Sequence, residues 1–325
     1  MLIPILLFIL GLICLIKGGD WFVDGAVSLA HRLNLPEILI GATVVAIGTT
    51  LPEVMVSATS AATGHGDLAY GNAIGSIICN TALISALTMA IRPAKIERKN
   101  LVVPSIAFFA AAAVYCVISY ITKTFTRVTG IILLAMFVAY MAISVKQSFG
   151  KSKISAAAET QEKKPEGKEL PVWKMILFLV LGAALIAVGA RLLVDNGTKI
   201  AEGFGVPETV IALTFVALGT SLPELVTAIT SLAKGHGALS VGNIIGANLF
   251  NLVLVSGISI TIQPFDLPSS KMLWGHNASL VLDLPLMLLV MLIMVVPALV
   301  KGRLYRWQGI VLLVLYAGFC AVQMI

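Results

Sequence analysis

The chain has 325 residues, of which 58% are hydrophobic and only 12% are charged, and its mean hydropathy is +1.00. This composition excludes a water-soluble domain and predicts an all-α membrane protein. The net charge of +6 sits mainly in the loops between apolar stretches, so it indicates orientation in a lipid bilayer; we expect no nucleic acid and no obligate protein partner.

Apolar stretches of about 20 residues, the length that spans the hydrocarbon layer, recur along the whole chain. The first carries Lys17, Asp20 and Asp24 and has no basic residue before its apolar run, so we interpret it as a retained helix rather than a signal peptide. The four cysteines show no metal or disulfide spacing. We predict ten spans, at 2–28, 34–62, 68–91, 101–121, 128–147, 172–200, 206–233, 239–262, 278–300 and 307–324.

The basic residues are unevenly divided between the two sides of the membrane. If the N-terminus is outside, the inner loops hold sixteen Lys and Arg residues and the outer loops hold four. The positive-inside rule then predicts a multi-pass protein of the cell inner membrane with both termini outside, in the periplasm. The polar segment 148–170 becomes a cytoplasmic linker between two five-helix halves, 1–147 and 171–325. It lacks dense acidic clusters, so we expect no Ca2+-sensing domain there.

The two halves repeat each other. A shift of 171 residues places 41–84 on 212–255 with 21 of 44 positions identical, including Gly-Thr-x-Leu-Pro-Glu and Gly-Asn-x-Ile-Gly. Each half has five spans, an odd number, so the second half enters the membrane from the opposite side. The sequence therefore predicts ten transmembrane helices in two inverted five-helix repeats, with a substrate site where the repeats meet at the middle of the membrane.

Glu53 and Glu224 occupy equivalent positions deep inside two spans, with no basic residue nearby. An ionised side chain at that depth costs about 3 kcal/mol or more, so such an acid marks a functional site. The alternative is a protonated Glu that is hydrogen-bonded inside the bundle, which would have to occur twice.

Pro52 and Pro223 precede these acids and free the carbonyls of Gly48 and Gly219. Small hydroxyl-bearing residues follow each glycine, so we predict that both segments unwind and aim oxygens into a polar cavity. The hydroxyl-bearing residues are Thr49, Thr50, Thr220 and Ser221.

The next span of each half supplies further oxygen donors. A spacing of four places Asn72, Ser76 and Asn80 on one helix face. The second half offers Asn243, Asn248 and Asn251, with Ala247 where the first half has Ser76. We expect the neighbouring glycines to permit close helix packing; they are Gly71, Gly75, Gly242 and Gly246.

The donor set predicts the ion. Two carboxylates, several amide oxygens and freed carbonyls make a hard site with a formal charge of −2. Ca2+ prefers six to eight oxygens in a flexible cage, whereas Mg2+ prefers a rigid octahedron that retains water. Copper and zinc are disfavoured because Cys79 is the only sulfur near this level.

Two further pairs recur between the halves. His65 and His236 lie in short glycine-flanked loops, where we favour a capping role over a gate or pH sensor. Asp24 and Asp195 lie near opposite ends of long spans, where we favour interfacial hydrogen bonding over ion binding.

At these motifs the sequence resembles the cation/Ca2+ antiporter superfamily, especially the prokaryotic sodium/calcium exchangers. The specific motifs lie in 41–84 and 212–255, the alpha-1 and alpha-2 repeats, and the likeness in topology covers nearly the whole chain. The resemblance implies a central Ca2+ site, flanking Na+ sites, no cofactor beyond these transported ions, and first and sixth helices that slide as a gate. It assigns ion ligation to Glu53, Glu224, Thr49, Thr50, Thr220, Ser221, Asn80, Asn251, Ser76 and the carbonyls of Ala46 and Ala217.

The chain departs from some relatives at two positions. Ala247 stands where some have Ser, which weakens the case for one flanking Na+ site. Asn251 stands where some have Asp, which leaves two acids rather than three and argues against K+ co-transport.

The function predicted from the sequence is exchange of Ca2+ for Na+ by alternating access. An H+/Ca2+ antiporter on the same scaffold is the nearest alternative, although hydroxyls beside each Glu favour Na+ because a proton needs no cage. A passive cation channel would need polar positions along a whole pore, and here they cluster at one depth. An intramembrane hydrolase would need a catalytic partner for the acids, so we predict that the protein is not an enzyme.

Overall fold

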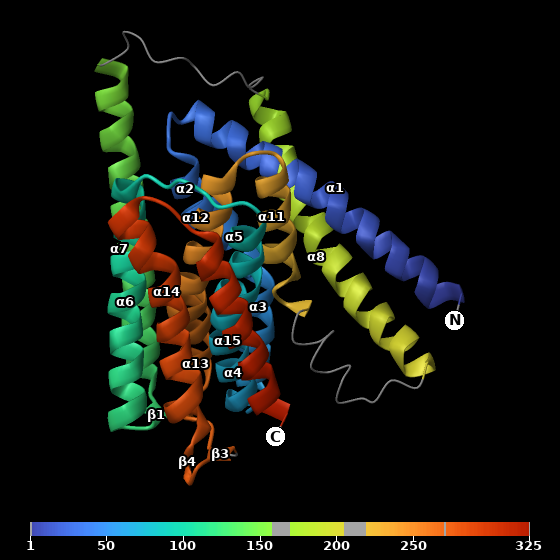
Figure 1. The fold of residues 1–325 in the computed structure, drawn as a ribbon, viewed down its shortest axis with the longest axis vertical. Helices are drawn as coiled ribbons and strands as arrows, with labels where there is room; N and C mark the ends of the chain where they lie inside the picture. Colours follow the sequence, from blue (N-terminus) through green and yellow to red (C-terminus); the bar gives the residue numbers. More distant parts are fainter. Residues whose placement is uncertain (1, 158–169, 205–218, 270, 325) are drawn as a thin grey trace.

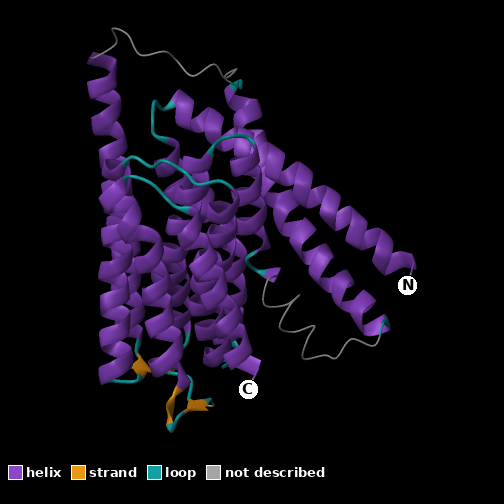
Figure 2. Ribbon diagram, viewed as in Figure 1, coloured by secondary structure: helices purple, strands orange, loops and turns teal. Residues whose placement is uncertain are grey.

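The computed structural model describes residues 2–157, 170–204, 219–269 and 271–324. It is built almost entirely of helices (Figures 1 and 2), as the apolar composition predicts. The first half contains α1 (Leu2–Arg32), α2 (Glu37–Ile40), η1 (Gly41–Val45), α3 (Ala46–Ala62), α4 (Gly66–Cys79), η2 (Asn80–Ser85), α5 (Ala86–Ile91), α6 (Arg98–Ile121), β1 (Thr124–Phe125) and α7 (Arg127–Ala157). The second contains α8 (Val172–Gly203), α11 (Leu222–Ala233), α12 (Gly237–Phe250), η4 (Asn251–Val255), α13 (Ser256–Ile262), β2 (Phe265–Asp266), β3 (Met272–Leu273), β4 (His276–Asn277), η5 (Ser279–Asp283), α14 (Leu284–Lys301) and α15 (Arg306–Met324).

Nine helices within the described ranges are long and apolar enough to cross a membrane. They match nine of the ten predicted spans in order and approximate extent. The predicted span 206–233 is represented by the shorter apolar helix α11, and its first part lies outside the described residues. The C-terminus lies at the end of the bundle opposite the linker ends of α7 and α8, and the N-terminus lies at the outer end of α1, to the side of the bundle (Figure 1).

The two motif-bearing spans form the centre of the bundle. In Gly66–Ile91 and Gly237–Ile262, 72% and 83% of the most apolar window is buried, against 22% for α1 and for α8. Their small and branched residues pack against α6, α7, α14 and α15 in one large apolar core. The repeats that carry the polar motifs are therefore shielded from lipid by the other helices.

Helices α1 and α8 form an antiparallel pair that leans away from the rest of the bundle (Figure 1). Glycines seven residues apart bring the backbones together: a Cβ added to Gly11 would lie 2.9 Å from the Gly189 carbonyl oxygen, and one added to Gly18 would lie 2.9 Å from that of Gly182. Small residues permit such close approach of helices within a membrane. Because α1 and α8 are repeat equivalents that run in opposite directions, the pair also shows that the halves are inverted.

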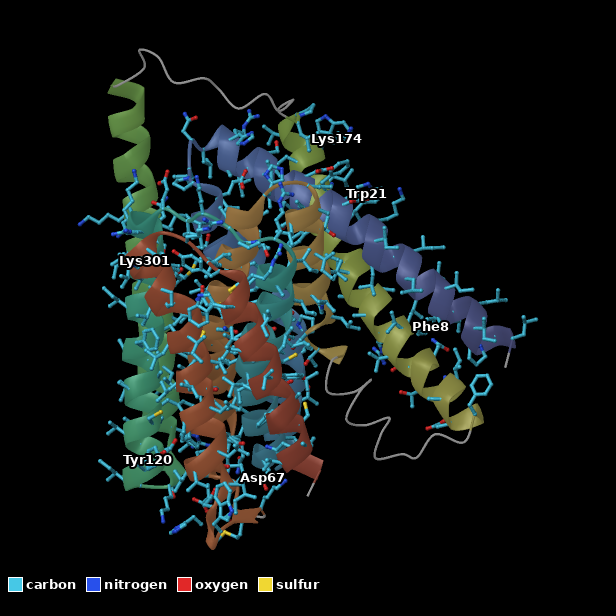
Figure 3. All side chains as sticks on the ribbon, viewed as in Figure 1. Phe8, Trp21, Asp67, Tyr120, Lys174 and Lys301 are labelled. Carbon is cyan, nitrogen blue, oxygen red and sulfur yellow. The ribbon has the colours of Figure 1, made fainter. Side chains whose placement is uncertain are left out.

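An aromatic contact also joins α1 and α8 near the linker end of the pair. Trp21 of α1 stacks on Phe178 of α8 with ring centroids 5.5 Å apart, and Lys174 lies 5.2 Å from the Phe178 centroid (Figure 3). Backbone contact along the glycines and ring contact here together make α1 and α8 one packed unit.

At the opposite end of the bundle, two short antiparallel ladders cap the helices. β1 pairs with β2 and so joins a loop of the first half to a loop of the second, with Phe125 opposite Phe265. β3 and β4 form a hairpin. These strands are two residues long and leave the all-α class unchanged.

Two sequence predictions need adjustment. Helix α7 continues to Ala157, so the beginning of the predicted linker 148–170 is helical; this segment contains no proline, and the helix continues through Gly150. Close packing at the glycines is confirmed for Gly242, whose added Cβ would collide with the Ile38 carbonyl, and for Gly246 against Ala42. No described atom lies within 4 Å of a Cβ added to Gly71 or Gly75.

Candidate ion-binding site

The two predicted acids lie on α3 and α11, and both are fully buried. Both oxygens of Glu53 and Oε2 of Glu224 have no hydrogen-bond partner among the described residues. Thr50 donates its hydroxyl to Glu224 Oε1 at 3.4 Å, a contact between the two halves. Buried carboxylate oxygens without partners are costly, so they indicate a place for a cation or a proton.

The backbone before the acids differs between the halves. In the second half the chain forms a turn at Thr220 and Ser221 before α11 begins, and the residues before Gly219 lie outside the described part of the chain. In the first half the predicted unwinding after Gly48 is wrong: α3 runs without interruption from Ala46 and contains Pro52. A proline removes a single hydrogen bond, and the remaining bonds of the helix carry it through.

Threonine hydroxyls link the two halves symmetrically. Thr49 donates to Asn243 Oδ1 at 3.2 Å, and its repeat equivalent Thr220 donates to Asn72 Oδ1 at 3.3 Å. A hydroxyl that donates its proton in this way keeps its own lone pairs available to a cation. Thr49 also lies 3.4 Å from the carbonyl oxygen of Ala46, which faces the same region.

Asn72 is already engaged by its neighbours. Its amide nitrogen donates to Ser57 Oγ at 2.8 Å and to the backbone oxygen of Glu53 at 3.3 Å, while its amide oxygen accepts from Thr220. Asn72 therefore ties α4 to α3 and orients a hydroxyl of the other half. Asn243 orients Thr49 in the same way, with its amide nitrogen unpaired among the described residues.

Asn80 and Asn251 are fully buried, and none of their four side-chain polar atoms has a hydrogen-bond partner within the described ranges. Each is the first residue of a π-helical segment, η2 or η4. Short π-helical insertions are frequent at functional sites because they re-aim side chains and backbone groups. The sequence identified both residues but gave no signal for the π geometry, which arises inside unbroken apolar runs.

The remaining predicted ligands take different positions. Ser76 is buried on α4, one turn before Asn80, and Ser221 is buried with its hydroxyl unpaired in the described part of the chain. Asn248 faces away from this group, because its amide donates to Thr81 Oγ1 at 2.7 Å and to Met291 Sδ at 3.2 Å. Ala217 lies outside the described residues.

The histidines and aspartates lie away from the acids. His65 and His236 lie in the tight turns directly before α4 and α12, and neither side chain hydrogen-bonds the first turn of its helix. His65 contacts Thr63 at 3.1 Å, and His236 contacts Glu37 at 2.8 Å. Asp24 and Asp195 each face a basic residue instead: Asp24 pairs with Lys234, and Asp195 pairs with Arg191.

Two inverted halves with buried acids, hydroxyls and amides at their junction define a secondary transporter for cations. The family model described as "Sodium/calcium exchanger protein" matches residues 3–146 and 174–325. The chain belongs to the sodium/calcium exchanger family, and it is a membrane transporter rather than an enzyme.

Several individual proteins resemble this chain over most of their length, which supports the family assignment. The solved structure of the sodium-calcium exchanger NCX_Mj is 32% identical, with a TM-score of 0.78, and the match covers 98% of each chain. The sodium/calcium exchanger MaX1 of Methanosarcina acetivorans is 29% identical, over 98% of this chain and 97% of the relative. The inner membrane protein YrbG of Escherichia coli is 36% identical over 81% of each.

Proposed function

We propose that this protein exchanges Ca2+ for Na+ across the cell inner membrane by alternating access at the junction of α3, α4, α11 and α12. The observation that carries the proposal is the group of buried oxygens without partners in the described structure, three of them carboxylate oxygens of Glu53 and Glu224. The similarity to proteins named as sodium/calcium exchangers supports the choice of ions. Both termini then face the periplasm, as the distribution of basic residues predicts.

The chemistry of the donors supports a central Ca2+. Glu53, Glu224, Asn80 and Asn251 offer carboxylate and amide oxygens from four segments, with a formal charge of −2 that balances one Ca2+. Ca2+ accepts six to eight oxygen ligands in irregular arrangements, and Thr50 and Ser221 lie next to the acids to complete such a set.

The threonine hydroxyls that bond to amide oxygens of the other half suit the flanking Na+ sites. Thr49 and Thr220 point their protons at amide oxygens of the other half, which leaves their lone pairs for a cation. Ser76 and the carbonyls of Ala46 and Ala217 belong to the same proposed sites. Asn72 and Asn243 support these sites by holding the threonines in place, and their own oxygens are the remaining proposed ligands.

The decisive experiment uses purified protein in liposomes loaded with Ca2+. One arm imposes a Na+ gradient, and the other imposes a pH gradient without Na+. We expect Ca2+ flux in the Na+ arm and little in the pH arm. Flux driven only by the pH gradient would show an H+/Ca2+ antiporter, and Ca2+ leakage without any opposing gradient would show a channel.

A further inference from the structure

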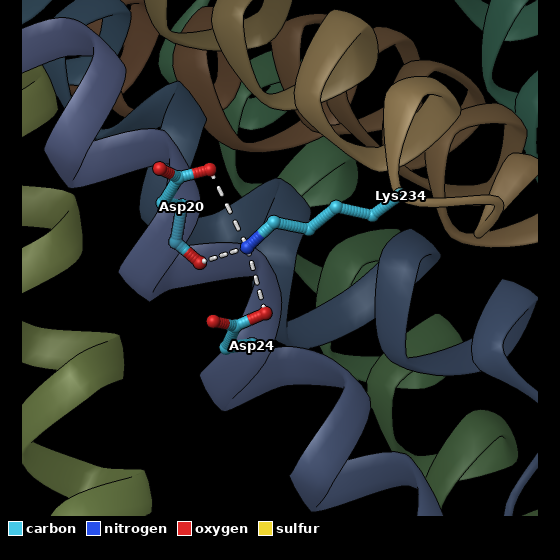
Figure 4. Close-up of polar contacts among 3 residues, drawn as sticks. All are labelled: Asp20, Asp24 and Lys234. Atoms are coloured by element: carbon cyan, nitrogen blue, oxygen red, sulfur yellow. Dashed lines mark hydrogen bonds and ion pairs between the residues drawn. The ribbon is translucent and has the colours of Figure 1, made fainter. Parts of the chain in front are cut away.

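A single lysine connects the helix bundle to α1 at the linker end of the molecule. Lys234, directly after α11, places its Nζ 2.7 Å from Asp24 Oδ1, 3.4 Å from Asp20 Oδ1 and 3.0 Å from the Asp20 backbone oxygen (Figure 4). Asp20 and Asp24 lie one helical turn apart on α1, so one ammonium group bridges both. The Lys234 side chain is only 29% exposed, which limits screening by solvent.

The loop that carries Lys234 is held to the bundle on both sides of the lysine. The Arg92 guanidinium donates to the Leu232 carbonyl at 3.3 Å, two residues before Lys234. His236, two residues after it, contacts Glu37 of α2 at 2.8 Å. Because contacts on both sides hold the loop, the ion pairs of Lys234 fasten α1 to the rest of the molecule.

At the repeat-related place at the other end of the molecule, the described residues form no such connection. The 171-residue shift relates Lys234 to Thr63, whose hydroxyl bonds to carbonyls of its own helix end. It relates Asp20 and Asp24 to Arg191 and Asp195, which pair with each other along α8 at 3.6 Å. Among the described residues, no ion pair joins α8 to the bundle there. Within the described part of the chain, the two ends of the inverted repeat are therefore fastened unequally.

We propose that Lys234, Asp20 and Asp24 form a latch that holds the cytoplasmic end of the α1 and α8 pair against the bundle. The glycine contacts pack the backbones of α1 and α8 against each other, so a bond to α1 restrains both helices. This inference rests on the proposed function: an alternating-access carrier must release the latch each time its site opens to the cytoplasm. The latch then favours the state that is closed on that side.

The test measures the distance between the gate helices and the bundle directly. Spin labels are attached to cysteines introduced at the exposed Trp173 on α8 and at the exposed Lys301 on α14, which Figure 3 labels. The full-length protein used for this has Cys14, Cys116 and Cys320 changed to Ala, and it keeps the buried Cys79. Pulsed electron paramagnetic resonance in nanodiscs is recorded at ion concentrations at which the unmutated chain shows both a short and a long distance.

We expect Lys234→Met to raise the ratio of the long to the short population about fivefold, the size expected of a partly buried ion pair with more than one acceptor. Lys234→Arg should keep the ratio within about twofold, because a guanidinium keeps a positive charge beside the two carboxylates. The double variant Asp20→Asn with Asp24→Asn should raise the ratio as much as Lys234→Met does. Adding Lys234→Met to the double variant should not raise the ratio further, as expected for residues that act through one contact. If Lys234→Met does not fold, Asp24→Asn alone replaces it as the test variant, because asparagine keeps the shape of the side chain; it should also raise the ratio.

The matched control is Arg191→Met, which removes the repeat-related ion pair that lies within one helix. It should leave the ratio within about twofold, since that pair does not join α8 to the bundle. An unchanged ratio in Lys234→Met, or an equal shift in Arg191→Met, overturns the latch. The distances need no ion gradient, so a chain that switches between them but exchanges no ions in liposomes refutes the proposed function and leaves the latch standing.

Discussion

Glu53 and Glu224 give the candidate site its formal charge, and neither has a basic partner among the described residues. We expect Glu53→Gln and Glu224→Gln each to reduce Ca2+ flux to below about a tenth, because each removes half of the charge that balances the ion. Thermal stability should be equal or higher, since the desolvation cost of the acid disappears. Flux in liposomes and the midpoint of thermal unfolding check both statements.

The matched control for these changes is Glu97→Gln, the same substitution at an exposed carboxylate that pairs with Lys99. It should leave flux unchanged. If both buried variants keep more than about a tenth of the flux of the unmutated chain, the two acids are not the Ca2+ ligands.

Ala247 is the single break in an otherwise symmetric polar face. It is fully buried on α12, one turn before Asn251, where its repeat equivalent is Ser76. We expect Ala247→Ser to lower the Na+ concentration for half-maximal exchange about threefold by restoring a hydroxyl ligand. Ala112→Ser on α6 makes the same change at another buried alanine and should have no effect on Na+ dependence. Equal Na+ dependence in the two variants would remove this position from the Na+ site.

The sequence predicted which residues meet at the site better than it predicted how they contact one another. Burying a carboxylate twice at equivalent positions is costly enough to identify Glu53 and Glu224 without a structure. The bonds from Thr49 to Asn243 and from Thr220 to Asn72 cross between the halves. Nothing within one half encodes such a contact, because it depends on how the two halves pack.

At the scale of helices, Gly246 shows how closely α12 packs against the first half. A Cβ there would lie 2.6 Å from the Ala42 Cα, in the backbone of η1. Gly246→Ala should destabilise the protein by about 1 to 3 kcal/mol, as overpacking of a filled core does. Gly318→Ala in α15, where no described atom lies within 4 Å of the new Cβ, is the control and should cost nothing. Thermal unfolding in detergent compares them, and equal midpoints would contradict the packing at Gly246.

Hydropathy and the internal repeat predicted the order of the spans and their inverted arrangement, because both depend on solvent and on the number of crossings. Backbone irregularity was harder to place. The prolines suggested unwinding in both halves, yet α3 stays helical, and among the described residues only the second half has a turn just before its proline, at Thr220 and Ser221. Further irregularity appears as π-helix in η1, η2 and η4. A π-helical segment depends on packing around the helix, and the sequence of the segment alone does not specify it.

For the molecule as a whole, we propose the division into halves 1–147 and 171–325 with the cytoplasmic linker 148–170 between them. The inverted pair α1 and α8 bridges that division, because each helix packs more closely on its equivalent than on the described residues of its own half. A carrier of this shape can move the pair past the central spans while the site stays in place. The latch at Lys234 acts on that motion and leaves the ion ligands untouched.

Charge at the site predicts how the whole carrier responds to voltage. With Glu53 and Glu224 ionised and Asn80 and Asn251 neutral, a site that holds one Ca2+ has no net charge. Two Na+ would also neutralise it, whereas a third would leave one positive charge. Moving one net charge across the membrane costs about 2.3 kcal/mol per 100 mV, so voltage should act mainly on the Na+ step.

The test compares Ca2+/Ca2+ exchange with Na+-driven Ca2+ flux in the same liposomes under imposed potentials. Ca2+/Ca2+ exchange should change little, and Na+-driven flux should change if a third Na+ is carried. Equal voltage dependence of the two would mean that the site does not contain two ionised acids. Asn251→Asp adds a third acid at a fully buried position, so its Ca2+-loaded site carries a net negative charge when all three acids are ionised. In that variant Ca2+/Ca2+ exchange should itself become voltage-dependent, because a charged carrier now crosses the field in the Ca2+ step.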